Sequence, residues 1–271
     1  MQIKKEVDKS LFIDLKKQYL NEITGPLDGM YFDGFLPQSD HFFIIKENVN
    51  IGYFCINSDG FILQFYINLK NQQKSSEHFK EILEKNKEIV KVNGALVSTA
   101  EPKYLSLCFD HFKNHSVTDL MFQKIDQKKS EKYDFKAENK LTLLKKENLD
   151  EVVEFAVDTI GMPENWCKEY FSNLINRNEI YGAWDDDNVL FATGESRGYD
   201  VFQKDYCDLG FMVHKNKQRK GVGTEIMKQL INLTENKGKI PICSTTPENI
   251  GSLKSIIKCG FYAPHRVIKF E

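Results

Sequence analysis

Residues 207–233 read CDLGFMVHKNKQRKGVGTEIMKQLINL, and this stretch decides the fold of the second half of the chain. Residues 207–213 are mostly apolar, which predicts a buried strand. A polar loop follows, and from about Gly221 apolar residues recur at the spacing of an amphipathic helix. The stretch therefore predicts a strand, a loop with two glycines and a helix in direct succession.

The loop before this helix has the properties of a phosphate site. The first turn of a helix leaves main-chain N–H groups without partners, and the helix dipole makes that end positive. Gly221 and Gly223 allow an anion to approach the backbone closely, while Arg219 and Lys220 add positive charge. We therefore predict that a phosphate or pyrophosphate group binds here.

Two other phosphate-binding patterns do not fit the loop. A Walker loop needs its Lys after the glycines, whereas Lys220 precedes them. A dinucleotide fingerprint needs a third glycine, where this chain has Ile226. A nucleotide-binding, kinase-like protein is therefore a poor alternative.

The rest of the second half alternates between strands and helices. Apolar runs predict strands at 141–144, 180–184, 189–195, 240–244 and 267–270. Helical spacing predicts helices at 149–160, 164–175 and 247–258. This order predicts an α/β protein, with a mixed sheet and flanking helices.

In this half the chain resembles the GCN5-related N-acetyltransferase (GNAT) superfamily. The family's central motif is an apolar strand ending in Val, a short loop, and Gln/Arg-x-x-Gly-x-Gly/Ala at the start of a helix. Here Phe211-Met212-Val213 precedes Gln218-Arg219-Lys220-Gly221-Val222-Gly223-Thr224. The next family block, Asn-x-x-Ala…Lys-x-Gly-Phe, resembles Asn249 and Ser252 followed by Lys258-Cys259-Gly260-Phe261. The resemblance covers about residues 135–271.

The resemblance implies a GNAT-like acyl-CoA N-acyltransferase fold and the activity of an N-acetyltransferase. Acetyl-CoA would be the co-substrate, and a primary amine of a small molecule or peptide would be the acceptor. The main-chain amides of one loop would hold the CoA pyrophosphate: Gln218, Arg219, Lys220, Gly221, Val222, Gly223 and Thr224. Met212 and Val213 would contact the pantetheine and the thioester carbonyl. Asn249 and Ser252 would touch the cofactor arm, although Asn249 is equally interpreted as a helix cap.

Two carboxylates are candidates for the catalytic proton acceptor. An amine with a pKa near 10 is protonated at neutral pH, and a carboxylate can take that proton directly or through water. The family often has an acidic residue on the strand before the motif, and Asp208 stands there. Glu195, late in the preceding strand, is the second candidate. The alternative for each is a solvated or salt-bridged carboxylate at a strand end.

One position departs from the family pattern. Many members have a Tyr that protonates the thiolate in the helix after Asn249, and this chain has Ile256 there. Tyr262, Cys243 and His265 are nearby in sequence. A thiol with a pKa near 8.5 is a good leaving group without an acid, so activity is not excluded. The alternative function is a non-catalytic acyl-CoA-binding sensor or interaction protein.

The first half repeats the second at an offset of 146 residues, the difference between 218 and 72. Gln72 and Lys74 fall on Gln218 and Lys220, and a similar order of strands and helices is predicted, although chance matching of common residues is an alternative. Expected strands are 42–46, 51–56, 61–67 and 95–98, and expected helices are 79–89 and 104–112.

The glycines are missing from the first copy of the loop. Ser75 and Glu77 stand where the second half has glycine, and Gln73 replaces Arg219. A carboxylate at a helix start would repel a pyrophosphate. Residues 124–140 are dense in charge and predict a linker. We therefore expect two tandem copies: a degenerate GNAT-like domain without a CoA loop at 1–130, and a GNAT acetyltransferase domain at 131–271.

The composition of the chain limits its expected partners and cellular compartment. The chain has 271 residues, a net charge of −2 and 41% hydrophobic residues, which predicts a real core and neither nucleic-acid nor membrane partners. No run approaches the roughly 20 apolar residues of a spanning helix, so we expect a cytoplasmic protein. Its six cysteines contain no Cys-x-x-Cys pair, which is typical of free core thiols. His111 and His115 are four apart on a predicted helix, but no third ligand is evident, so no metal is expected.

Overall fold

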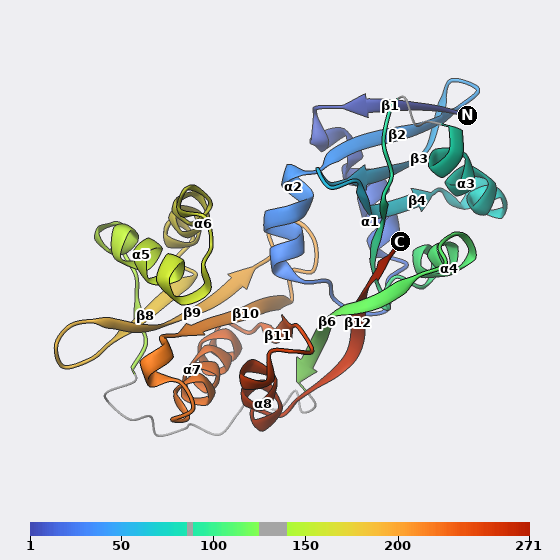
Figure 1. Cartoon of the computed structure of the whole chain (residues 1–271). Helices are drawn as coiled ribbons and strands as arrows, with labels where there is room; N and C mark the ends of the chain where they lie inside the picture. Colours follow the sequence, from blue (N-terminus) through green and yellow to red (C-terminus); the bar gives the residue numbers. More distant parts are fainter. Residues whose placement is uncertain (86–88, 125–139) are drawn as a thin grey trace. The chain divides into compact units, whose positions relative to one another are not determined.

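The structure is a computed structural model that describes residues 1–85, 89–124 and 140–271. It divides into two compact units (Figure 1). Unit 1 consists of Met1–Leu120 together with His265–Glu271, and unit 2 consists of Met121–Pro264. The domain boundary expected near residue 130 lies outside the described residues.

Unit 1 contains strands in the order β1-β2-β3-β4-β5-β12. Its strands are antiparallel to their neighbours except for the parallel pair β4 and β5. The elements are β1 (Gln2–Glu6), η1 (Lys9–Phe12), α1 (Ile13–Leu20), η2 (Tyr31–Phe35), α2 (Leu36–Gln38), β2 (Asp40–Lys46), β3 (Val49–Ile56), β4 (Phe61–Ile67), η3 (Leu69–Lys74), α3 (Ser75–Lys85), β5 (Gly94–Ser98), α4 (Pro102–His111) and the end of β12 (Phe261–Phe270).

Unit 2 contains strands in the order β6-β11-β10-β9-β8-β7. Its parallel pair is β10 and β11, and β7, β8, β9 and β10 are antiparallel in sequence order. The elements are the end of β6 (His115–Lys124), β7 (Thr142–Leu143), η5 (Lys146–Asn148), α5 (Leu149–Ile160), α6 (Glu164–Asn176), β8 (Ile180–Trp184), β9 (Leu190–Gly198), β10 (Tyr206–Val213), η6 (Lys215–Lys217), α7 (Val222–Asn236), β11 (Ile240–Thr245) and α8 (Ile250–Lys258).

The two halves of the chain have the same order of elements, as the sequence repeat predicts. Each half runs strand, two helical segments, three antiparallel strands, helix, strand, helix and strand. The offset of 146 is kept where the copies match best, because Gly94 and Ile240 begin β5 and β11, and His115 and Phe261 begin β6 and β12. The chain is therefore a duplicated α/β domain.

The last strand of each half ends in the other unit. By the repeat, β12 corresponds to β6. Yet the end of β12 pairs with β5 of unit 1, from Val267 opposite Ser98 to Phe270 opposite Ala95. The end of β6 belongs to unit 2, where β6 is the neighbour of β11. The two units have thus exchanged their final strands.

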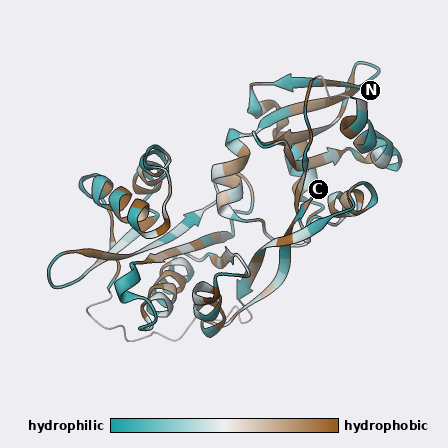
Figure 2. Cartoon of the chain, viewed as in Figure 1, coloured by the Kyte–Doolittle hydropathy of each residue, from teal (hydrophilic) through white to brown (hydrophobic). Residues whose placement is uncertain are grey.

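The core of unit 2 lies on both faces of its sheet. Helices α5 and α6 cover one face and α7 and α8 the other (Figure 1). Ile226, Met227 and Leu230 of α7 are fully buried, and each such side chain contributes about 1.5–3 kcal/mol of burial free energy. The helices of this unit show both teal and brown residues (Figure 2), as expected for amphipathic helices.

The expected elements of unit 2 agree closely with the structure. Helix 149–160 and strand 180–184 are found with the predicted bounds. The helix expected at 247–258 begins only at Ile250, since Asn249 is its N-cap. The sequence did not reveal β1, α1 or β6, nor the first six residues of β12. Helix α3 ends at Lys85, and residues 86–88 of the expected helix lie outside the described residues.

The six cysteines are all free and buried. Among the described residues, no helix is long and apolar enough to cross a membrane. In the same parts of the chain, no group of three or more His, Cys, Asp and Glu side chains could hold a metal ion.

Candidate active site in the second unit

The parallel strands β10 and β11 part from each other near Asp208. Their last pair is Asp208 with Ile242, although β10 continues to Val213 and β11 to Thr245. On its other edge, β10 stays paired with β9 as far as Val213 opposite Ala192. The edge of β10 after Asp208 therefore faces an opening between two strands, where its main-chain groups need partners other than β11.

The loop after β10 contains two residues in the left-handed conformation. These are Arg219, with φ of 59°, and Gly221, with φ of 86°. Left-handed residues in a loop turn neighbouring N–H groups towards one side, which creates a concavity for anions. Gln218 fixes this loop to the strand end, because its Nε2 donates to the Val213 carbonyl at 2.9 Å.

Helix α7 begins without a side-chain cap. Its N-cap residue is Gly221, whose carbonyl accepts from the amides of Thr224 at 3.0 Å and Glu225 at 3.2 Å. Within the described ranges, no acceptor is found for the amides of Val222 and Gly223. Two main-chain donors and the positive end of the helix dipole are therefore available to an anion.

Glycine is needed at the two positions of the loop for different structural reasons. A Cβ on Gly221 would meet no atom within 4 Å, so glycine is required there by the positive φ. A Cβ on Gly223 would lie 2.9 Å from Phe211 Cε2 and 3.4 Å from Ser255 Oγ. Glycine at 223 therefore allows α7 to pack closely on β10, whereas the sequence suggested only the approach of an anion.

The positive charges expected at the rim are at the surface. Arg219 and Lys220 are exposed. The nearby Lys217 is engaged with Asp185 at 3.6 Å. The loop thus presents two cationic side chains beside the uncapped helix end, which fits the charge of a diphosphate.

The other residues expected in the cofactor site gather around the same helix end. Met212 packs partly buried against the core under α5 and α6, and Val213 and Val222 are buried. The Thr224 carbonyl accepts from Cys259 Sγ at 3.7 Å, which ties α7 to the end of α8. The structure therefore brings 212–213 and 218–224 together at one junction of strand, loop and helix.

Asn249 has the capping role that was one of its two interpretations. Its Oδ1 accepts from the amide of Ser252 at 3.1 Å, at the start of α8. The side chain of Asn249 is exposed. Helix capping uses the Oδ1 atom and leaves the Nδ2 donor at the surface, so capping and ligand contact are compatible.

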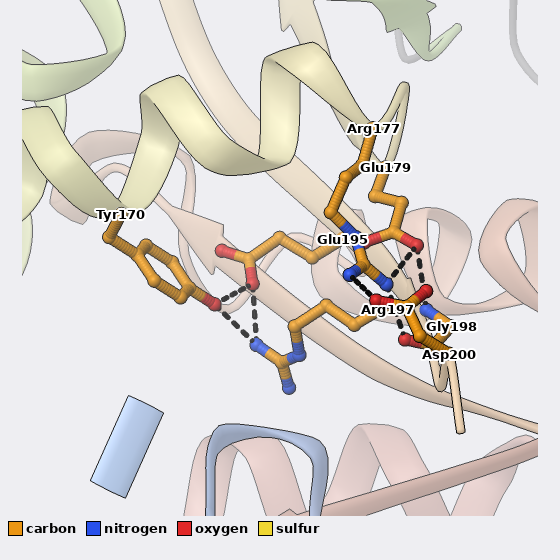
Figure 3. A network of polar contacts seen from close by, with 7 residues as sticks. All are labelled: Tyr170, Arg177, Glu179, Glu195, Arg197, Gly198 and Asp200. Carbon is orange, nitrogen blue, oxygen red and sulfur yellow. Dashed lines mark hydrogen bonds and ion pairs between the residues drawn. The ribbon is translucent and has the colours of Figure 1, made fainter. Parts of the chain in front are cut away.

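The two candidate carboxylates share one arginine. Arg197 Nη1 donates to Glu195 Oε2 and Nη2 donates to Asp208 Oδ2, both at 2.5 Å. Tyr170 on α6 donates to the same Glu195 oxygen at 2.6 Å and accepts from Arg197 Nη1 at 2.8 Å (Figure 3). The alternative to a catalytic role was a solvated or salt-bridged carboxylate at a strand end. Both carboxylates are salt-bridged and buried.

Strand register explains why these side chains meet. Asp208 lies opposite Arg197, and Gly210 lies opposite Glu195, in the antiparallel pair of β10 and β9. All four positions face the same side of the sheet because side chains alternate along a strand. A Cβ on Gly210 would lie 3.2 Å from Arg197 Nη1, so this glycine leaves the space that the ion pairs occupy.

The network is buried. Asp208 is 1% exposed, and Glu195 and Arg197 are 6% exposed. Burial also raises the pKa of the Tyr170 hydroxyl well above its ordinary value, so it stays protonated and acts as a donor. Sequence reasoning missed both Arg197 and Tyr170. The available signal was the pair Glu195 and Arg197 at i and i+2, which share one face of a strand.

A second arginine network lies at the same end of β9. Arg177 donates to Glu179 Oε2 at 2.8 Å and to Asp200 Oδ2 at 2.7 Å (Figure 3). It also donates to the Gly198 carbonyl at 2.6 Å, while the Gly198 amide donates to Glu179 Oε1 at 2.8 Å. This cluster joins the end of α6 to β8 and the end of β9.

Residue 256, where many family members have a tyrosine, lies in the core of the protein. Ile256 is 1% exposed on α8. Of the three alternatives near it in sequence, Tyr262 is 46% exposed and Cys243 is buried. His265 belongs to unit 1, where its Nδ1 lies 3.2 Å from Thr99 Oγ1.

Unit 1 has the same parting of strands, but tyrosines fill the positions next to it. The parallel pair β4 and β5 ends at Ile62 opposite Ala95. Tyr104 donates to the Ile62 carbonyl at 2.9 Å, and Tyr31 donates to the Leu63 carbonyl at 2.8 Å. Side-chain hydroxyls thus bond to two main-chain carbonyls at the point where the strands of unit 1 part.

The first copy of the loop also differs from the second. It forms the short helix η3, which runs directly into α3 at Ser75. Within residues 69–77 no residue has a positive φ. A continuous helical backbone does not form the concavity that Arg219 and Gly221 form in unit 2.

Comparisons with known proteins agree with this architecture. A family model described as an acetyltransferase (GNAT) domain matches residues 10–125, and one described as the acetyltransferase (GNAT) family matches residues 123–261. A GNAT-family acetyltransferase from Colwellia psychrerythraea is 35% identical, with a TM-score of 0.92, over 100% of this chain and 99% of its own. No curated protein matches the chain.

Two more distant structures share the fold. A tandem GNAT protein from the clavulanic acid biosynthesis pathway is 11% identical over 100% of this chain and 98% of its own, with a TM-score of 0.68. A GCN5-related N-acetyltransferase from Sphaerobacter thermophilus is 11% identical over 89% of this chain and 82% of its own, with a TM-score of 0.58.

The fold and the two family-model matches place the chain among the acyltransferases. The chain belongs to the GNAT acetyltransferase family and carries two GNAT domains in tandem. Members of this family generally use acetyl-CoA and act on amine acceptors.

Proposed function

We propose that this protein is an N-acetyltransferase that moves an acetyl group from acetyl-CoA to a primary amine of a small molecule or peptide. The observation that carries the proposal is the uncapped start of α7, next to the strand edge that β11 leaves open. A single CoA molecule would then place its diphosphate at the helix start and its pantetheine arm along the strand edge.

The cofactor residues are proposed from their place around this helix end. In the loop from Gln218 to Thr224, the amides of Val222 and Gly223 have no acceptor among the described residues and would bind the pyrophosphate. The amides of Gln218 and Thr224 already donate to the Lys215 and Gly221 carbonyls. The open edge of β10 at Met212 and Val213 would bind the pantetheine and thioester. Exposed Asn249 and half-buried Ser252 would contact the cofactor arm.

The chemistry needs a proton acceptor and a polarised carbonyl. Glu195 and Asp208 are the carboxylates on the face of β9 and β10 that Tyr170 also contacts. A main-chain N–H on the open edge of β10 would stabilise the negative charge that develops on the thioester oxygen. The CoA thiolate, with an ordinary thiol pKa near 8.5, leaves without a dedicated acid, which is consistent with Ile256.

We propose that unit 1 does not bind acyl-CoA. Tyr104 and Tyr31 fill the point where β4 and β5 part, since they donate to the Ile62 and Leu63 carbonyls. Helix α3 begins without a left-handed loop, and Glu77 adds negative charge to its first turn. One acyl-CoA per chain is therefore expected.

Isothermal titration with acetyl-CoA, followed by a thiol-release assay over a panel of amines, tests the proposal. Saturable binding of one acetyl-CoA per chain and amine-dependent release of CoA are expected. No binding at millimolar acetyl-CoA would contradict both the cofactor site and the activity.

The absence of a tyrosine at Ile256 favours one alternative, a non-catalytic acyl-CoA sensor or interaction protein. It predicts acetyl-CoA binding without turnover on any amine, and binding that is unaffected by Asp208→Asn. The same two assays separate this alternative from the enzyme.

A further inference from the structure

We propose, on the basis of the proposed function, that Glu195 accepts the amine proton, and that Asp208, Arg197 and Tyr170 are positioning residues that act through it. The two carboxylates are not equivalent in the structure, although sequence reasoning gave Asp208 the stronger claim. The two carboxylates differ in their burial and in whether an oxygen remains free to accept a proton.

Glu195 has one engaged oxygen and one open oxygen. Its Oε2 accepts from both Tyr170 and Arg197. No partner for Oε1 is found among the described residues, and in Figure 3 the dashed lines reach only one of the two carboxylate oxygens. The two hydrogen bonds to Oε2 hold the carboxylate in one orientation, and Oε1 is available to accept a proton.

Asp208 lies deeper. Its side chain is 1% exposed, against 8% for Glu195, and its Oδ2 is bonded to Arg197 Nη2. Asp208 is also the last residue of β10 that is paired with β11, so it lies at the point where the strands begin to part and not along the open edge. It therefore serves as a counter-charge for the arginine.

The charges of the cluster explain why both carboxylates are needed. Arg197 divides its guanidinium between Glu195 and Asp208, so two negative groups share one positive group. Asp208 therefore balances part of the positive charge of Arg197, which would otherwise act on Glu195 alone.

The remaining neighbours of Glu195 carry no competing charge. On α6 the contacting group is Tyr170, and on β9 and β10 the charged groups are Arg197 and Asp208. Strand β8 places the apolar Ile180 opposite Glu195. The residues of α5 buried in this core are apolar, and its acidic Glu151 is bonded to Trp184 Nε1.

The reaction step balances with these groups. The amine nitrogen forms a bond to the acetyl carbon of acetyl-CoA, and the carbon–sulfur bond breaks. The proton that the nitrogen loses goes to Glu195 Oε1, directly or through one water. The electron pair of the broken bond leaves with the CoA thiolate, which takes a proton from water.

Kinetics against pH test the assignment. Glu195→Gln is expected to lower kcat by about 10²-fold or more, the size of a general-base effect, with acetyl-CoA binding unchanged. Asp208→Asn is expected to keep kcat within about tenfold and to move the acidic limb of kcat/KM to lower pH. Tyr170→Phe is expected to lower kcat more than it changes KM.

Glu179→Gln is the matched control. Glu179 is another buried carboxylate bonded to an arginine, Arg177, in the same sheet. This variant is expected to lower stability and to leave the pH profile where it is in the wild type. A profile displaced equally by both variants would show a general effect of buried charge and would overturn the proposal.

A second measurement does not depend on turnover. The carbon-13 signal of the Glu195 carboxyl, assigned by its loss in Glu195→Gln, is expected to move in Asp208→Asn. An unchanged signal would refute the coupling through Arg197, and full activity of Glu195→Gln would refute the proton acceptor. Acetyl-CoA binding without wild-type turnover on any amine would instead contradict the proposed function, and the role of Glu195 with it.

Discussion

At the scale of single residues, Gly221 and Gly238 form a matched pair at the two ends of α7. Both have a positive φ, 86° and 70°, and a Cβ on either would meet no atom within 4 Å. Alanine at either position should cost about 1–2 kcal/mol of stability, since only the left-handed backbone is strained. The two sites differ only in their distance from the proposed diphosphate loop.

Gly221→Ala should therefore bind acetyl-CoA about tenfold more weakly, because a relaxed backbone turns the loop amides away from the anion. Gly238→Ala should lose similar stability and bind acetyl-CoA normally. Calorimetric titration and thermal unfolding of both variants check this. Equal weakening of binding by the two substitutions would contradict the role of the loop.

Glu101 gives the N-terminal unit a dependence on pH. Its carboxyl is buried and accepts from the Tyr19 hydroxyl and from the Ser98 amide, the latter at 2.5 Å. Burial raises the pKa of Glu101 to about 7, from the ordinary carboxyl value of 4.5. The folded state therefore binds the proton more tightly, and stability falls as pH rises from about 4.5 to 7 and stays low above that range.

Glu101→Gln should remove this dependence. Wild type should lose about 3 kcal/mol of unfolding free energy between pH 4.5 and pH 8, and the variant much less, because glutamine is neutral throughout. Both tryptophans lie in unit 2, so a urea transition seen by circular dichroism and not by tryptophan fluorescence reports unit 1. A wild type that is more stable at pH 8 than at pH 5 would contradict the prediction.

Individual residues show how much of the site could be predicted from the sequence. The loop of residues 218–224 could be predicted, because glycines and positive charges at a strand–helix junction form a local sequence pattern. The shared arginine was not, because Asp208 and Arg197 meet through strand register across 11 residues. Whether Asn249 caps a helix or contacts a ligand was also open in the sequence, and the structure shows the cap without excluding the contact.

At the scale of elements, the close approach of α7 to β10 depends on Gly223. Gly223→Ala should destabilise unit 2 by about 1–3 kcal/mol, because its Cβ would lie 2.9 Å from Phe211 Cε2. Adding Phe211→Leu should recover part of the loss by removing the ring. Urea unfolding followed by tryptophan fluorescence measures both variants.

Gly251→Ala provides the comparison within a neighbouring helix. Gly251 lies in α8, and the nearest atom to an added Cβ is 3.9 Å away. This variant should be about 0.5 kcal/mol more stable than wild type, since alanine restricts the unfolded chain. A loss of stability equal to that of Gly223→Ala would mean that close packing on β10 is not the cause.

Elements with a strong local period were predictable, and those defined by distant partners were not. Helix α5 has its buried residues at helical spacing and was predicted with its observed bounds. Strand β12 contains Pro264 and several polar residues, and only its last four residues pair with β5. Its partner lies more than 160 residues earlier, so no local pattern reveals it.

At the scale of the whole molecule, the exchanged strand makes unit 1 depend on the C-terminus. Phe270 is fully buried in the unit 1 core, where it contacts Phe109 and Phe112. Phe270→Ala should cost about 3–5 kcal/mol, and ending the chain after Pro264 should cost more. In both variants, amide hydrogen exchange should accelerate relative to wild type in β4 and β5 more than in β8 and β9.

Glu271→Ala is the control for this prediction. Glu271 is exposed, and its main-chain bonds to Asn114 do not involve the side chain. Its exchange pattern should match that of wild type. Faster exchange confined to unit 2 in Phe270→Ala would contradict the assignment of the last strand to unit 1.

The exchanged strand also sets the order in which the protein is completed during synthesis. Residues 265–271 are translated after the whole of unit 2, yet they belong to the unit that contains Met1. On the ribosome, the sheet of unit 1 therefore stays incomplete until unit 2 has also been made. Synthesis of the segment that follows unit 2, and not the emergence of residues 1–120, is the event that allows unit 1 to become native.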